Sequence, residues 1–177
     1  MERQDITALV VPVAVAAFVQ PFRVKYLHRP GVTMPPHVTL HAPFKDKEDI
    51  NENVLNTLAE LFGSHAQFQF TLARTARFSD TGVLYLAPEP AEPFLALSRA
   101  IQAHYPDTPS DHPNPVMHLT LALSGAEALD GIEDEFQRQY GNRLPIEATA
   151  TEVHLFEKRE NAWIKQTSFA LSDSHKQ

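Results

Sequence analysis

The chain has 177 residues, of which 43% are apolar and 21% charged, a composition typical of one globular domain over residues 1–177. The absence of cysteine excludes disulfides, thiol nucleophiles and cysteine-based zinc sites. A net charge of −7 without a cluster of Lys and Arg argues against a long nucleic-acid duplex as the partner.

The first half of the chain alternates between two periodicities. Apolar residues at every second position predict strands, and apolar residues three or four positions apart predict helices. Prolines and glycines such as Pro43 and Gly63 end these segments. The expected elements are a strand (8–15), a helix (16–28), a strand between Pro36 and Pro43, a helix (46–62) and a hairpin (68–78 and 83–87, with a turn at 80–82).

The second half repeats much of this order. It is expected to form a helix (92–105), a proline-rich loop (106–115), a strand (116–123), a helix (127–140) and a final hairpin (146–156 and 163–171) around a polar turn. Alignment of the two halves at an offset of 81 residues superposes the helices and hairpins that follow. We therefore predict an internal duplication, with two α+β lobes related by pseudo-twofold symmetry.

One four-residue phrase occurs twice, as His37-Val38-Thr39-Leu40 and as His118-Leu119-Thr120-Leu121, and the chain has no other His-x-Thr triplet. Two such tetrads arise by chance in on the order of one chain in a hundred or fewer. Because side chains alternate along a strand, each phrase places an imidazole and a hydroxyl on one face and two aliphatic residues on the other. The structural alternative is a pair of half-exposed strands whose histidines are only polar surface residues.

These paired motifs, in a chain of this size, resemble those of the two-histidine (2H) phosphoesterase superfamily. Its members include 2'-5' RNA ligases and RNA 2',3'-cyclic phosphodiesterases. Residues 36–44 (PHVTLHAPF), and Phe78 followed by residues 82–86 (GVLYL), are similar to the 2'-5' RNA ligase-like branch. The resemblance implies an antiparallel sheet flanked by helices in each lobe and an active-site groove between the lobes. It also implies catalysis without a metal or cofactor.

By that resemblance, His37 and His118 are the catalytic pair, and Thr39 and Thr120 bind phosphate oxygens. The side chains suit this chemistry. Imidazole titrates near neutral pH, so one ring can accept a proton while the other donates one. Hydroxyl groups can donate hydrogen bonds to the non-bridging phosphate oxygens, where negative charge is held. Which histidine is the acid and which is the base stays open at the level of the sequence.

Five further residues are candidates for substrate binding: Phe44, Phe78, Tyr85, Trp163 and Lys165. An aromatic ring can stack on a base and an ammonium group can contact a phosphate, although core packing is the alternative for each aromatic residue. His41 shares a strand face with His37, but no cluster of His, Asp and Glu completes a ligand set in the sequence pattern. No metal is therefore expected.

The sequence predicts a metal-independent phosphodiesterase that acts on a 2',3'-cyclic phosphate or a 2'-5' linkage of an RNA end or small nucleotide. One alternative is a hydrolase of cyclic nucleotide or oligonucleotide messengers with the same site, and another is a non-catalytic module that binds nucleotides or RNA ends. No apolar run reaches the ~20 residues of a membrane span, and the polar N-terminus does not resemble a secretion signal. A cytoplasmic monomer without a membrane partner is therefore expected.

Overall fold

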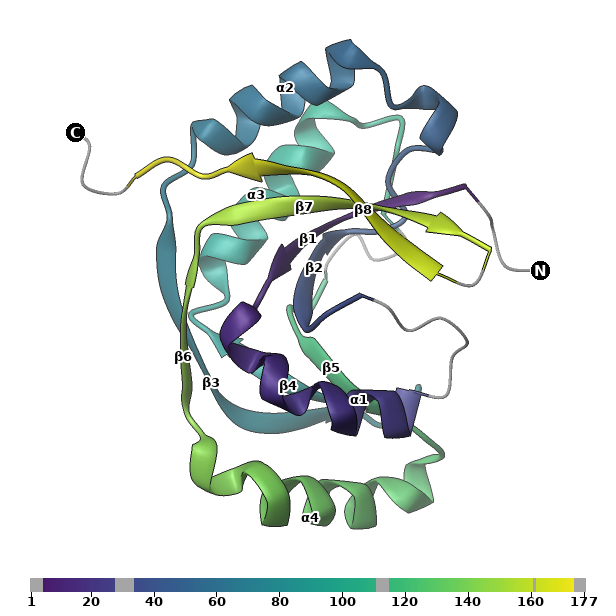
Figure 1. Ribbon diagram of the computed structural model, residues 1–177, viewed down its shortest axis with the longest axis vertical. Coiled ribbons are helices and arrows are strands. Elements are labelled where there is room, and N and C mark those ends of the chain that lie inside the picture. The colour runs from purple at the N-terminus through teal and green to yellow at the C-terminus, as the bar shows by residue number, and fades with distance from the viewer. Residues whose placement is uncertain (1–4, 28–33, 111–114, 161, 174–177) are drawn as a thin grey trace.

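The computed structural model describes residues 5–27, 34–110, 115–160 and 162–173. Two four-stranded sheets form the framework (Figure 1), and all strand pairs within them are antiparallel. In spatial order, the first sheet contains β2 (His37–His41), β1 (Thr7–Pro12), β7 (Glu152–Arg159) and β8 (Ala162–Ala170). The second contains β5 (Leu119–Leu123), β4 (Val83–Glu89), β3 (Phe68–Phe78) and β6 (Ile146–Ala150).

Helices flank both sheets. The α-helices are α1 (Gln20–Leu27), α2 (Glu52–Gly63), α3 (Glu92–His104) and α4 (Leu129–Tyr140). Short 3-10 helices are η1 (Ala14–Val19), η2 (Lys47–Asp49), η3 (Ala126–Ala128) and η4 (Gly141–Arg143). Figure 1 shows α2 and α3 at the end of the molecule that holds the first sheet, α4 at the opposite end, and α1 between them. The α+β fold with two sheets and flanking helices is thus confirmed.

The two lobes are interleaved along the chain. The hairpin β3–β4 follows the first motif strand, β2, but it pairs with the second motif strand, β5. Conversely, β7 comes after the second motif yet lies beside β1 in the sheet of the first motif. Neither lobe is therefore built from one continuous half of the sequence.

Several predicted segments differ from the structure. The predicted strand 8–15 ends at Pro12, and the predicted strand 116–123 begins at Leu119, so His118 lies just before β5. The predicted strand 146–156 is two strands in different sheets, β6 and β7, so only β7 and β8 form the final hairpin. The predicted helix 16–28 begins as the 3-10 turn η1 and continues as α1, and His28 lies outside the described residues. Within 46–62, α2 begins only after Asn51, whose side chain accepts a hydrogen bond from the Val54 N–H. A capping residue of this kind starts a helix by satisfying one of its free N–H groups.

The main hydrophobic core includes side chains from both sheets and from all four α-helices. Its largest fully buried members are Phe62, Phe94 and Phe136, one each from α2, α3 and α4. The alternation predicted for the motif strand holds in β2, where Val38 and Leu40 are 0% and 1% exposed. Among the described residues, no helix is long and apolar enough to cross a membrane.

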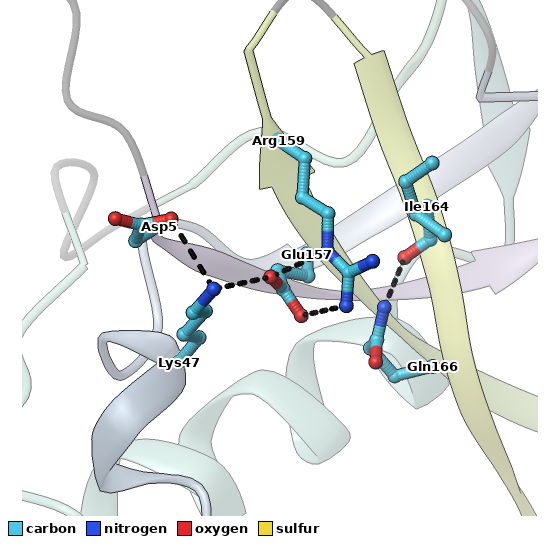
Figure 2. Close-up of polar contacts among 6 residues, drawn as sticks. All are labelled: Asp5, Lys47, Glu157, Arg159, Ile164 and Gln166. Carbon is cyan, nitrogen blue, oxygen red and sulfur yellow. Dashed lines mark hydrogen bonds and ion pairs between the residues drawn. The ribbon is translucent and has the colours of Figure 1, made fainter.

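A buried carboxylate on β7 contacts Arg159 on the same strand and Lys47 on η2 at one end of the first sheet (Figure 2). Glu157 on β7 is only 4% exposed. Arg159 donates from Nε to Oε1 of Glu157 over 2.8 Å, and Lys47 Nζ lies 3.6 Å from the same oxygen and 3.7 Å from Oδ1 of Asp5. The Arg159 hydrogen bond is the main cause that lowers the pKa of Glu157 below its usual 4.5.

The substitution Glu157→Gln is expected to lower the melting temperature near neutral pH, with a difference that shrinks in acid. A depressed carboxyl pKa stabilises the fold fully above about 4.5, and this stabilisation is lost as the pH falls through the folded-state pKa. Thermal unfolding of both proteins from about pH 7 to about pH 3 measures this. Glu92→Gln is the matched control, because Glu92 and Arg99 form an exposed pair that contributes little. A difference that stays constant down to the lowest pH would contradict the expectation.

Candidate active site

The two motif strands are the edge strands of their sheets, and β2 and β5 lie in contact (Figure 1). His37 and Thr39 are half-buried side chains on β2, and they alternate with core residues. Thr120 on β5 and His118, immediately before it, are also half-buried. Within the described residues, neither threonine hydroxyl has a hydrogen-bond partner. The fold therefore brings the two His-x-Thr pairs to one place, with both hydroxyl groups available.

Each motif histidine is anchored in the same way. Nδ1 of His37 lies 2.8 Å from the carbonyl oxygen of Pro35, and Nδ1 of His118 lies 2.7 Å from that of Val116. A carbonyl oxygen only accepts, so Nδ1 must carry the proton in both rings. In the neutral ring Nε2 is then the atom that can accept a proton, and the same hydrogen bond fixes the ring orientation. The two imidazoles thus share the same tautomer and the same kind of backbone anchor.

The electrostatic surroundings of His37 favour its neutral form. Burial is the largest cause that lowers its pKa from 6.5 to about 4, and the positive charge of Arg23 is the second. His118 also lowers the pKa of His37, whereas the hydrogen bond to Pro35 raises it. His37 is therefore neutral at neutral pH and can accept a proton.

Two of the predicted binding residues surround the His118 ring. Phe78 and Tyr85 stack on each other with ring centroids 4.4 Å apart. Both rings meet His118 edge to face, at 5.1 Å for Phe78 and 5.4 Å for Tyr85. Tyr85 is also the cross-strand partner of Thr120. The contacts show these aromatic residues packing around His118, and they favour a positioning role for both.

Trp163 and Lys165 lie farther from the histidines. Strand pairing places both side chains on the face of the first sheet that carries Thr39. Val10 on β1 is the partner of Thr39, and Phe156 on β7, which lies on the same face, is the partner of Lys165. Their strand, β8, is at the opposite edge from β2, three strand spacings away, or about 14 Å at ~4.8 Å per spacing. Trp163 packs against a small apolar cluster that includes Phe156, and Lys165 is exposed. The structure therefore puts them on the shared face but not beside the reacting phosphate.

Phe44 is not brought to the site. It is 3% exposed, belongs to the main core, and meets the rings of His41 and Tyr105 edge to face. His41 is fully buried as well, and its Nε2 donates to the carbonyl oxygen of Thr108 over 2.7 Å. The described residues contain no group of three His, Asp or Glu side chains suited to hold a metal ion.

Arg23 is the residue of this region that sequence reasoning missed. It lies on α1, is 3% exposed, and donates from Nε to the carbonyl oxygen of Thr120 over 2.9 Å and from Nη1 to that of Met34 over 3.0 Å. The feature that could have indicated Arg23 was its position in the helix, because it lies on the buried side of α1 with Phe22 and Leu27. A charged residue is rarely fully buried unless it is paired, so an arginine on the buried side of a helix is unusual.

Comparison with known families decides the classification. The profile of the 2'-5' RNA ligase superfamily matches residues 11–162, most of the chain and both motifs. The chain belongs to this superfamily. The match confirms the resemblance inferred from the paired tetrads. Among curated proteins, no sequence matches this member of the superfamily.

Solved structures support the same fold at low sequence identity. A crystal structure described as a phosphoesterase has a TM-score of 0.64 and 16% identity, with 96% of this chain and 99% of that chain covered. The structure of LigT from E. coli in complex with 3'-AMP gives the same values. TT0787 of Thermus thermophilus has a TM-score of 0.57 and 18% identity, with 96% and 100% covered. At these identities the likeness shows a shared fold.

Proposed function

We propose that this protein is a metal-independent phosphodiesterase that hydrolyses a 2',3'-cyclic phosphate or a 2'-5' phosphodiester of an RNA end or small nucleotide. The observation that carries the proposal is the matched pair of imidazoles, one on β2 and one immediately before β5. Each ring is held by a hydrogen bond from Nδ1 to a backbone carbonyl, and the two strands lie in contact. A structural role for two surface histidines does not require this symmetry.

In the proposed reaction, Nε2 of one imidazole takes a proton from water as the water oxygen forms a bond to phosphorus. The bond between phosphorus and one ribose oxygen breaks, and that oxygen receives a proton from the second imidazole. One water molecule is consumed, and exchange with solvent restores both rings. Proton transfers of this kind contribute about 10²–10⁴-fold each to the rate. In the reverse direction the same two groups join ends, as a ligase does.

The threonine hydroxyls complete the proposed site. Thr39 and Thr120 each share a strand face with a motif histidine, two residues away. Their hydroxyls are suited to donate hydrogen bonds to the non-bridging phosphate oxygens as negative charge develops there. Structures of LigT with 3'-AMP, NADP+ and ATP, to which this fold is similar, favour a nucleotide as the ligand here. Trp163 and Lys165 are proposed to contact a part of the substrate distant from the reacting phosphate.

The test is turnover with EDTA present. We expect the purified protein to hydrolyse 2',3'-cyclic AMP or 2'-5'-linked diadenylate in EDTA, with the product identified by chromatography. A 3',5'-cyclic nucleotide and a cyclic dinucleotide, assayed in parallel, represent the messenger alternative. Activity confined to those two substrates would favour that alternative. Binding of 3'-AMP without turnover of any substrate would favour the non-catalytic module, and loss of all activity in EDTA would reject the metal-independent mechanism.

A further inference from the structure

A buried positive charge lies where the two motif strands meet. Arg23 is 3% exposed, and burial lowers the pKa of its guanidinium to about 10, so it remains charged at neutral pH. Its hydrogen-bond partners are the carbonyl oxygens of Thr120 and Met34 and the side-chain amide oxygen of Gln20. None of the described carboxylates forms an ion pair with it. Such a charge is costly to bury, and a buried cation is normally paired with an anion.

The hydrogen bonds of Arg23 connect the two halves of the site. Thr120 belongs to the second motif, and Met34 precedes His37 of the first motif by three residues. One rigid, planar guanidinium thus holds β5 and the chain entering β2 at a set separation, through Nε at 2.9 Å and Nη1 at 3.0 Å. Because proton transfer depends on a closely defined geometry, this separation controls how the two imidazoles face one phosphorus.

Arg23 also acts on His37 electrostatically. The charged groups that act on His37 are Arg23 from α1 and His118 from just before β5, and the positive charge of Arg23 has the larger effect. Both charges disfavour the protonated form of His37, so Arg23 helps to keep this ring neutral.

We infer that Arg23 is a positioning residue of the active site, which joins the two motif strands and brings its positive charge to His37. The inference rests on the proposed function, because it concerns how the two histidines of that reaction are held. The charge of Arg23 and its forked geometry make separable contributions. Two substitutions can therefore divide them, Arg23→Gln removing the charge and Arg23→Lys keeping the charge without the fork.

The experiment combines an NMR titration of the His37 imidazole with pH profiles of kcat/KM on a 2',3'-cyclic nucleotide. In Arg23→Gln, the His37 pKa is expected to rise from about 4 yet stay below 6.5, because burial, the larger cause, remains. The limb of the pH profile that reports His37 should move upward with it. In Arg23→Lys, the His37 titration should stay near that of the wild type while kcat falls roughly ten- to a hundredfold, since the strands lose their fixed separation.

Arg99→Gln and Arg99→Lys are the matched controls, because Arg99 is an exposed residue of α3 paired with Glu92. They should leave titration and turnover unchanged, and all measurements are made below the melting temperature of each variant. An unchanged His37 titration in Arg23→Gln, or wild-type kcat in Arg23→Lys, would overturn the inference. If Arg23→Gln does not fold, the kcat of Arg23→Lys and its titration decide alone. Absence of turnover in the wild-type protein would instead reject the proposed function, a separate result from an unmoved titration.

Discussion

Alanine at His37 or at His118 is expected to lower kcat for a cyclic phosphate by about 10²–10⁴-fold. Each ring presents Nε2 to the reaction, and its Nδ1 is committed to the backbone at Pro35 or Val116. Loss of either ring removes a proton acceptor or donor from the transition state, while most contacts with the bound substrate remain. The effect should therefore appear in kcat more than in KM, as steady-state kinetics of both variants would measure.

The double variant gives a sharper test of joint action. If the two imidazoles act in one transition state, the combined loss should be well below the product of the two single losses. His104→Ala is the matched control, because His104 lies exposed at the end of α3, outside the candidate site. Substantial turnover in both single variants, above about a tenth of the wild-type value, is incompatible with the expected 10²-fold minimum.

The second large effect is on stability. Phe94→Ala is expected to lower the free energy of unfolding by about 3–5 kcal/mol. Phe94 is 0% exposed and meets Phe68 and Phe70 edge to face, with ring centroids 4.9 Å apart in both pairs. Truncation removes these contacts and leaves a cavity between α3 and β3. Against a typical total stability of roughly 5–15 kcal/mol, this loss is large. Urea unfolding followed by circular dichroism measures it.

Two variants delimit the origin of this effect. Phe94→Leu keeps much of the buried volume and should cost clearly less than Phe94→Ala. Val24→Ala removes methyl groups from a side chain that is 60% exposed, and it should change stability by no more than about 0.5 kcal/mol. A loss below about 1 kcal/mol in Phe94→Ala would show that the site collapses without a cavity, contrary to the packing described here.

Local rules explain why much of the fold was predictable. A strand alternates its side chains, so the burial of Val38 and Leu40 follows directly from the tetrad once the segment is extended. A helix has its own period, so the segments of α2, α3 and α4 follow from the spacing of their apolar residues. The turn at 80–82 is equally local, because Gly82 has a φ of +70°, a conformation that glycine adopts without the steric cost of a Cβ.

A similar reason explains why some predicted site residues lie at the site whereas Phe44 does not. The histidines and threonines carry their chemistry in a motif whose geometry is set within four residues, so their orientation on the strand was predictable. Phe44 carries no such constraint, and packing against Tyr105, far along the chain, placed it in the core. For Phe78 and Tyr85 the sequence predicted a place near the site. Their ring contacts with His118 favour a role in positioning this imidazole.

By itself, the sequence determined the strands and helices, the two His-x-Thr faces and the family to which the chain belongs. Only the tertiary structure decided which strands share a sheet, where the segment 146–156 divides, and that Arg23 lies between the motif strands. The reason is physical: periodicity and turn chemistry act over a few neighbouring residues. Strand pairing and the burial of a charge depend instead on which distant surfaces pack together, and the same local pattern is compatible with several partners.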